Sequence, residues 1–178
     1  CYSMGIEVIS PSINLSGIDF TIKKDQILFG LSAIKNLGDS AIRNIIDNRN
    51  TLGVFKSFSD LCDRLPSNIL NKRNLESLIH CGALDEFSEN NNRAQLFSDL
   101  EFVMEWASSR NRDRISGQGN LFDSISKTDN KEFSLSRGSK VEDYSLIEKL
   151  KLEKQLLGFY LSDHPLNHLA KQAKLVSP

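Results

Sequence analysis

The sequence predicts a mainly α-helical protein with a small N-terminal β-hairpin, a helix-hairpin-helix domain, a flexible linker and C-terminal helices. Two observations support this fold class. Apolar and polar residues alternate as far as Phe29, whereas from Gly30 onward the apolar residues recur every three or four positions, which indicates helices. Residues 108–140 are rich in Ser, Asn, Asp, Gly and Arg and poor in apolar residues, which is the composition of a mobile linker.

Short stretches near the N-terminus are typical of strands. Residues 4–11 are a β-branched run that is closed by Pro11. Residues 18–22 alternate between apolar and polar, and residues 26–29 follow after two lysines and an aspartate. We therefore expect the second and third stretches to be the arms of a β-hairpin.

Apolar spacing and terminus signals divide the rest of the chain into helices. Gly82 has the position of a helix C-cap. Ser145 and Glu148 form a capping box, which opens a helix that ends near Gly158. The other predicted helices are two short segments that join at residues 36–39, residues 55–65, residues 70–79, residues 96–107, and a short amphipathic segment that begins at His164-Pro165.

Composition excludes several classes of protein. The 178 residues carry 22 basic and 23 acidic side chains, so nucleic acid would have to bind at a local site rather than by bulk attraction. No apolar run approaches the ~20 residues that cross a bilayer, and there is no secretory signal. Three cysteines (Cys1, Cys62 and Cys81) favour a reducing, cytoplasmic compartment. Because the chain starts at Cys1 rather than methionine, we expect it to be a piece of a longer protein.

Residues 30–42 have the layout of a helix-hairpin-helix. In this interpretation Gly38 allows the backbone to turn where a Cβ would be costly. An ordinary αα-hairpin, which uses glycine only to turn, fits the same spacing. The two helices are expected to pack around Ile34, Leu37, Ile42 and Ile45.

The second helix of this hairpin would present a row of free N–H groups from Leu37 to Ser40, and a DNA phosphate can bind there without sequence preference. Lys35 and Arg43 stand where they would add positive charge. A second helical pair follows, but its turn has no glycine. The sequence leaves open whether Lys72 and Arg73 contact phosphates or form a solvated face.

Histidines and cysteines offer weaker candidates. His80 next to Cys81 suggests a metal site, but no second Cys or His stands at ligand spacing, so buried thiols in helices are the better interpretation. A small hydrolase that uses His164 or His80 is a further alternative. His164 precedes a proline and has no evident nucleophile or orienting partner, which favours a structural histidine in a turn.

Four blocks of residues carry a resemblance to a known family. In chain order the blocks are Ile13–Gly38, Phe55–Cys62 with Leu70–Ile79, Cys81–Asp85, and Glu153–Leu166. They resemble, in the same order, the region after the fingers domain of the bacterial DNA polymerase III alpha subunit, the C-family of replicative polymerases. The third block reads Cys-Gly-Ala-Leu-Asp where that family usually has Ala-Gly-Ala-Phe-Asp, and Asp163 in the fourth block stands where the family more often has glycine.

The resemblance implies a parent enzyme that is a DNA-directed DNA polymerase of the bacterial replisome and uses Mg2+ held by aspartates of its palm domain. The palm would lie upstream, so no catalytic residue, metal ligand or cofactor is assigned to this chain. The implied contacts with double-stranded DNA are Lys35, Asn36, Leu37, Gly38, Asp39 and Ser40, to which Arg43 is added. The implied domains are the end of the fingers (1–12), the helix-hairpin-helix domain (13–90), a connecting helix (91–107), the linker (108–144) and a helical segment (145–178) that leads to an OB-fold beyond the chain.

One apolar island interrupts the linker. Gln118-Gly119-Asn120-Leu121-Phe122 has the Gln-x-x-Leu-Phe form of a peptide that docks on a sliding clamp. Leu121 and Phe122 would fill an apolar pocket while Gln118 forms hydrogen bonds at its edge. The family places its internal clamp motif in this interval. The expected partners are therefore double-stranded DNA, the sliding clamp (beta subunit) and other replisome subunits, with no membrane.

A stand-alone helix-hairpin-helix adaptor in DNA repair or recombination is the alternative function. The start at Cys1 and the polymerase-like blocks outside the hairpin favour the replicative polymerase over this adaptor.

Overall fold

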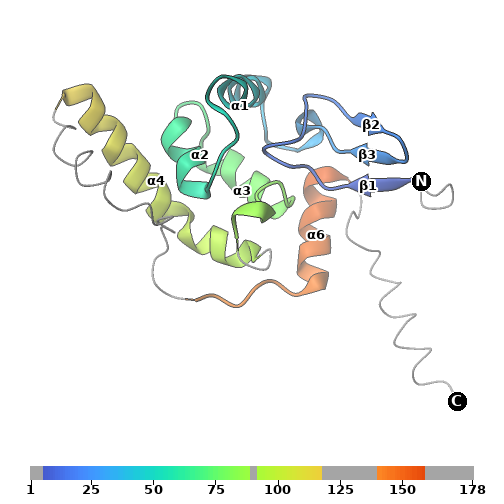
Figure 1. Ribbon diagram of the computed structural model, residues 1–178. Helices are drawn as coiled ribbons and strands as arrows, with labels where there is room; N and C mark the ends of the chain where they lie inside the picture. Colours follow the sequence, from blue (N-terminus) through green and yellow to red (C-terminus); the bar gives the residue numbers. More distant parts are fainter. Residues whose placement is uncertain (1–5, 89–91, 118–139, 159–178) are drawn as a thin grey trace, which may run out of the picture.

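The computed structural model describes residues 6–88, 92–117 and 140–158. Helices pack around one core, and a small sheet lies at one side of them (Figure 1). The predicted mainly α fold class is confirmed. The elements in chain order are β1 (Glu7–Ile9), β2 (Thr21–Lys23), β3 (Gln26–Leu28), the 3-10 helix η2 (Leu31–Ala33), α1 (Asp39–Leu52), α2 (Phe58–Arg64), α3 (Lys72–His80), the 3-10 helix η3 (Asp85–Phe87), α4 (Arg93–Ser116) and α6 (Leu146–Leu157).

The strands form a three-stranded sheet in the order β1-β3-β2. β2 and β3 pair antiparallel, with Ile22 opposite Ile27, which confirms the predicted β-hairpin. β1 pairs parallel to β3 on its other side, with Val8 opposite Ile27. Phe29, which follows β3 directly, is only 1% exposed, so the sheet leads the chain straight into the helical core.

The core lies where the helices meet. α4 packs along both α2 and α3, and α6 packs against α3. Each of these helices buries one apolar stripe, as the spacing of its apolar residues predicts. No helix of the described ranges is long and apolar enough to cross a membrane. The largest fully buried side chains include Phe29, Phe55, Ile42, Ile45, Leu61, Leu75, Leu78, Ile79 and Leu84.

α4 is longer than the sequence predicts. We expected the linker to begin at residue 108, but the helix continues to Ser116. The polar residues of this extension hold it against α2, because Asp63 accepts hydrogen bonds from Arg110 Nε at 3.3 Å and from Arg114 Nη2 at 2.6 Å. A polar composition here therefore reflects a helix whose contacts are ion pairs rather than apolar packing.

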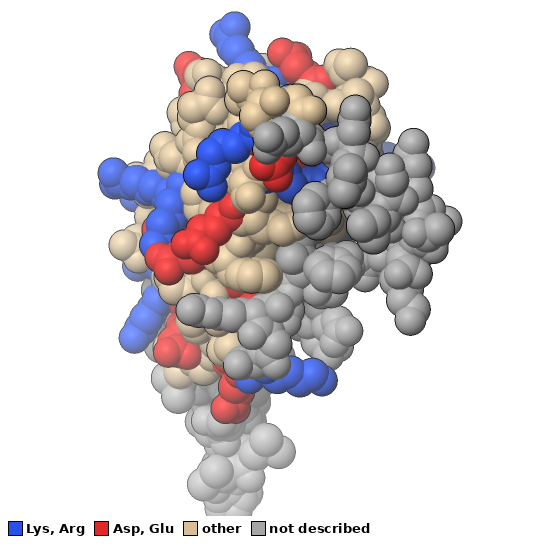
Figure 2. Space-filling view, turned by 90° about the vertical axis from the view of Figure 1, so that its left-hand side faces the viewer, with Lys and Arg blue, Asp and Glu red and all other residues tan. Residues whose placement is uncertain are grey.

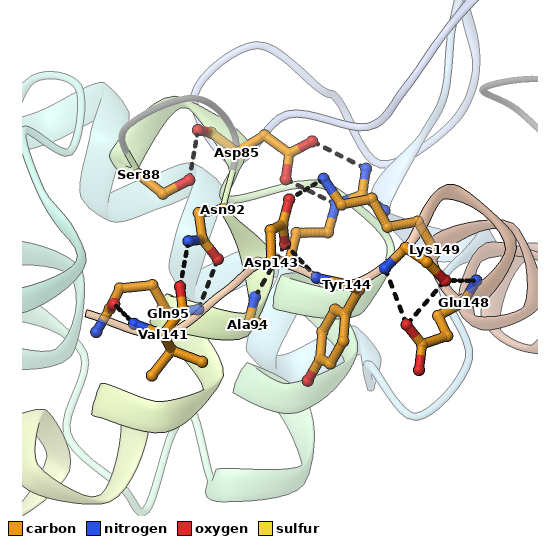
Figure 3. Close-up of polar contacts among 12 residues, drawn as sticks. Asp85, Ser88, Asn92, Ala94, Gln95, Val141, Asp143, Tyr144, Glu148 and Lys149 are labelled. Carbon is orange, nitrogen blue, oxygen red and sulfur yellow. Dashed lines mark hydrogen bonds and ion pairs between the residues drawn. The ribbon is translucent and has the colours of Figure 1, made fainter. Parts of the chain in front are cut away.

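Residues 140–145 return to the beginning of α4, and we call them the strap (Figure 3). Asn92 Nδ2 donates to the carbonyl of Val141 at 2.8 Å, and the N–H of Val141 donates to Gln95 Oε1 at 2.8 Å. Ser145 and Glu148 then form the predicted capping box, which starts α6. The strap places α6 beside α3 although the two helices are far apart in the sequence.

A buried ionic cluster ties α4 to its neighbours. Arg93 makes two hydrogen bonds to Asp85, at 2.8 and 2.9 Å, and one to Glu153 of α6 at 3.0 Å. Burial alone would lower the pKa of Arg93, but hydrogen bonds and charges of the two carboxylates outweigh it and raise the pKa. Gly82, which was predicted to cap α3, has a left-handed φ of +91° and lies against this cluster.

Candidate nucleic-acid interface

The predicted hairpin consists of a single 3-10 turn, η2, followed by the long helix α1. The first of the two predicted short helices is therefore a single turn of 3-10 helix, Leu31–Ala33, and not an α-helix. The four residues that were expected to hold the hairpin together are buried, at 7% exposure or less. They are Ile34, Leu37, Ile42 and Ile45.

The prediction that Gly38 turns the chain because a Cβ would be costly there is wrong. The φ of −78° and ψ of 157° of Gly38 are open to any residue, and an added Cβ would meet no atom within 4 Å. The left-handed residue of the turn is Asn36, with a φ of +65°. Asparagine tolerates this conformation better than most residues do. Asn36 thus shapes the turn, while Gly38 leaves the start of α1 free of a side chain.

The beginning of α1 carries open hydrogen-bond donors. The first helical bond runs from the N–H of Ile42 to the carbonyl of Gly38, at 3.1 Å. Among the residues that the structure describes, no hydrogen-bond acceptor faces the N–H groups of Gly38, Asp39 and Ser40, and no side chain caps them. All three residues are exposed. Such a row of N–H groups at the positive end of a helix binds anions.

The charges around these donors are mixed. Lys35 and Arg43 are exposed, and within the described ranges neither side chain has an ion-pair partner. Asp39 adds a negative charge in the first turn of α1. Leu37 belongs to the core, so only its backbone can face a ligand.

The charged residues are mixed on one further face of the molecule as well. Figure 2 shows the side of the molecule that faces left in Figure 1, where Lys and Arg lie next to Asp and Glu. In the part of this face that the structure describes, they do not merge into one basic surface. On the described part of this face, as in the balanced composition, the charges favour a local site over bulk attraction for nucleic acid.

The second helical pair differs from the first at this point. Asn71 and Asn74 form a capping box at the N-terminus of α3, in which each side chain accepts a hydrogen bond from the other residue's N–H. Lys72 pairs with Glu101 of α4, and the hydrogen bond from this pair raises the pKa of Lys72. Of the two basic residues for which the sequence leaves a phosphate contact open, Lys72 is therefore paired within the fold and Arg73 is exposed.

Two contacts at the hairpin turn connect residues that are distant in the sequence. Asn74 Nδ2 donates to the carbonyl of Asn36 at 2.7 Å. The N–H of Lys35 donates to the carbonyl of Leu156, in the last turn of α6, at 3.0 Å. Sequence reasoning missed both Asn74 and Leu156, because the apolar period within one segment carries no signal for hydrogen bonds between segments.

The remaining candidates separate into described and undescribed residues. Burial raises the pKa of both Cys62 and Cys81 to about 12, in line with buried thiols. The ring of His80 lies 3.3 Å from the hydroxyl of Tyr144, and burial lowers its pKa. In the described ranges no three His, Cys, Asp or Glu side chains are arranged to hold a metal ion. The clamp motif, Gln118–Phe122, and His164 lie outside the described residues.

The family described as "Helix-hairpin-helix motif" matches residues 5–96, which include the sheet, the hairpin and the start of α4. The chain belongs to this helix-hairpin-helix family.

Curated relatives of this helix-hairpin-helix chain confirm its resemblance to the bacterial DNA polymerase III alpha subunit. It is 40% identical to the DNA polymerase III subunit alpha of Thermus aquaticus over 164 residues, which are 92% of the chain and 12% of the relative. It is also 40% identical to that of Deinococcus radiodurans over 163 residues, and 36% identical to that of Bacillus subtilis over 169 residues. The chain spans only 12–14% of the length of these relatives.

Proposed function

We propose that this chain is the portion of a bacterial DNA polymerase III alpha subunit that binds duplex DNA and the sliding clamp. The observation that carries the duplex-binding part is the row of open N–H groups at Gly38, Asp39 and Ser40, in a chain of the helix-hairpin-helix family. The similarity to alpha subunits extends over 92% of the chain, well beyond the hairpin, which favours a polymerase over a stand-alone adaptor.

In this proposal one phosphate of the DNA backbone binds at the N-terminus of α1. Backbone N–H groups donate to its oxygens, and Lys35 and Arg43 lie on either side in the sequence to add charge. Contacts of this kind position a duplex without reading its sequence. Asp39 limits the attraction, so the site would guide a duplex that the rest of the parent enzyme holds.

A salt titration of duplex binding tests this part. In the 178-residue chain, Lys35→Gln with Arg43→Gln should weaken binding to duplexes of different sequence to a similar extent. The slope of log K against log salt should become less negative by about 1, since one phosphate contact contributes about 0.9. Lys23→Gln with Lys24→Gln removes the same two charges from exposed positions of the β2–β3 hairpin and should leave the slope unchanged. Equal effects of the two double variants would reject the site.

The clamp-binding part is supported by the sequence of the motif and by its place in the chain. Gln118 follows directly after Gly117, which ends α4 with a left-handed φ of +71°. The two arginines on Asp63 hold the last turns of this helix in place. The motif would thus begin where a rigid helix ends.

Binding to a bacterial sliding clamp in a titration tests the motif. Leu121→Ala with Phe122→Ala should abolish binding, because both apolar anchors are lost. Ser124→Ala with Ser126→Ala, in the same segment, should leave the affinity as it is. Affinity that survives the first double variant would refute the docking role.

The activity of the whole protein is part of the same proposal. We propose that the parent is a cytoplasmic DNA-directed DNA polymerase that works with other replisome subunits and holds Mg2+ in a palm domain outside this chain. The described residues contain no cluster that fits such a metal. Because the palm aspartates are expected outside this chain, the 178-residue chain should incorporate no nucleotide on a primed template in the presence of Mg2+, and robust incorporation would contradict this division of roles.

A further inference from the structure

We infer that Asn74 and the last turn of α6 are positioning elements that hold the hairpin turn in its phosphate-binding shape. The inference rests on the proposed function, since it concerns the same turn. It assigns a role in DNA binding to α6, whose residues lie beyond the stretch 5–96 that matches the helix-hairpin-helix family.

Asn74 acts through both ends of its amide group. Its Oδ1 accepts from the N–H of Asn71 at 3.0 Å, which completes the capping box of α3. Its Nδ2 donates to the carbonyl of Asn36 at 2.7 Å. Asn74 is only 7% exposed, so water does not readily replace either partner. One side chain therefore fixes the left-handed residue of the turn to the N-terminus of α3.

α6 supplies the second fixed point. The last four carbonyls of a helix have no partner within it, and that of Leu156 accepts from the N–H of Lys35 at 3.0 Å. Leu156 is 8% exposed, and Glu153, one turn earlier, is fully buried and bonded to Arg93. α6 is thus anchored in the core at the place where it contacts the turn.

The two contacts hold adjacent residues of the turn, Lys35 by its N–H and Asn36 by its carbonyl. These residues come directly before Leu37 and the open N–H groups that begin at Gly38. A turn that is fixed before it binds loses less conformational freedom on binding, which strengthens the affinity. Loss of either contact should therefore weaken duplex binding without removing any atom that touches DNA.

A pair of isosteric variants in the 178-residue chain tests the role of Asn74. Asn74→Asp keeps the oxygen that caps α3 and removes the amide that holds Asn36. Asn71→Asp introduces the same charge at the exposed N-cap of the same helix, where its oxygen still accepts from the N–H of Asn74. Asn74→Asp should lower the affinity for a mixed-sequence duplex about fivefold, the loss typical of one hydrogen bond, whereas Asn71→Asp should change it less than twofold.

A pair of glycine variants tests the role of α6. Gly158 ends α6 with a φ of +88° and Gly117 ends α4 with a φ of +71°, and at both an added Cβ meets no atom within 4 Å. Gly158→Ala should loosen the last turn of α6, speed amide hydrogen exchange at Lys35 about fivefold, and weaken duplex binding. Gly117→Ala carries a similar backbone strain at the other helix and should change neither quantity.

The outcomes separate the two claims. If Asn74→Asp binds as tightly as Asn71→Asp, the positioning role of Asn74 is wrong. If Gly158→Ala leaves exchange at Lys35 unchanged, the role of α6 is wrong. A third outcome is that the wild-type chain fails to bind duplex while Gly158→Ala speeds hydrogen exchange at Lys35 as expected. That result would overturn the proposed function and still support the fixation of the turn.

Discussion

Replacement of Gly82 by alanine should destabilise the fold far more than a single added methyl group suggests. Gly82 has a φ of +91°, and a Cβ on it would lie 2.5 Å from Nη2 of Arg93 and 3.1 Å from Oδ2 of Asp85. The arginine side chain is long, but it cannot swing away easily. It is 4% exposed and is held by Asp85, Glu153 and the carbonyl of His80.

The expected magnitude has two parts. A left-handed backbone costs a residue with a Cβ about 1–2 kcal/mol. Displacement of Arg93 weakens charge-assisted hydrogen bonds, each of which contributes roughly 1.5–3 kcal/mol. We therefore expect Gly82→Ala to lower the free energy of unfolding by about 4 kcal/mol, out of the 5–15 kcal/mol or so that is typical of a domain. In a chain of this size the midpoint of thermal unfolding should fall by about 8–16 °C.

Denaturant and thermal unfolding, followed by circular dichroism, provide the assay. Gly117→Ala is the matched control, because its φ is also positive but an added Cβ meets no atom within 4 Å. This control should cost only the left-handed backbone strain, about 1–2 kcal/mol. If Gly82→Ala costs no more than Gly117→Ala, then Arg93 moves aside freely and the reasoning about a rigid ionic cluster is refuted.

Three further predictions concern other parts of the fold. Burial lowers the pKa of His80, so the unfolded state takes up its proton first and stability should fall as pH drops below about 6.5 through the folded pKa. His80→Phe should flatten this dependence in unfolding curves measured from pH 8 to 5, and equal pH dependence of the two chains would refute the role of His80. Asp63→Asn should leave the core intact but speed amide hydrogen exchange in residues 108–116 of α4, because Arg110 and Arg114 lose the carboxylate that they share. Unchanged exchange in these residues would show that the end of α4 does not depend on these ion pairs. Gly38→Val should change the free energy of unfolding by less than about 1 kcal/mol, since the backbone of Gly38 is extended and an added Cβ would meet no atom within 4 Å. The same variant should weaken duplex binding, because it places a side chain over the open N–H groups. A large loss of stability would instead support the turn role that the sequence predicts for Gly38.

The features that the sequence predicts correctly are those that depend on neighbours in the chain. The capping box of Ser145 and Glu148 spans three residues, and the buried stripe of Ile42 and Ile45 lies on one helix, so local spacing is enough to find both. The β2–β3 hairpin follows for the same reason. The parallel pairing of β1 with β3 was not predicted, because it joins residues that a turn does not connect.

At the candidate site, features that depend on contacts between distant segments could not be predicted from the sequence. The donors of α1 were found from a turn followed by a helical period, but the residue with the left-handed backbone is Asn36 and not Gly38. Asparagine is common in many settings, so its conformation depends on the contacts around it. Asn74 and Arg93 find partners 38 and 60 residues away, and no periodic pattern encodes these pairs.

The return of the strap to the beginning of α4 sets the minimum distance that the chain between Gly117 and Lys140 must cover. α4 has 24 residues and is about 36 Å long. Val141 bonds to the first turn of this helix, whereas Gly117 follows its last turn, so the chain between them must cover that length. The 23 steps from Gly117 to Lys140 can reach about 75–80 Å, and about eleven would be enough. Phe122 is at most about 18 Å of contour from the end of α4. A clamp held by this motif would therefore be joined to α4 by a short arm and to α6 by a long one, and about ten residues could be deleted from 123–139 before the strap was pulled from its place.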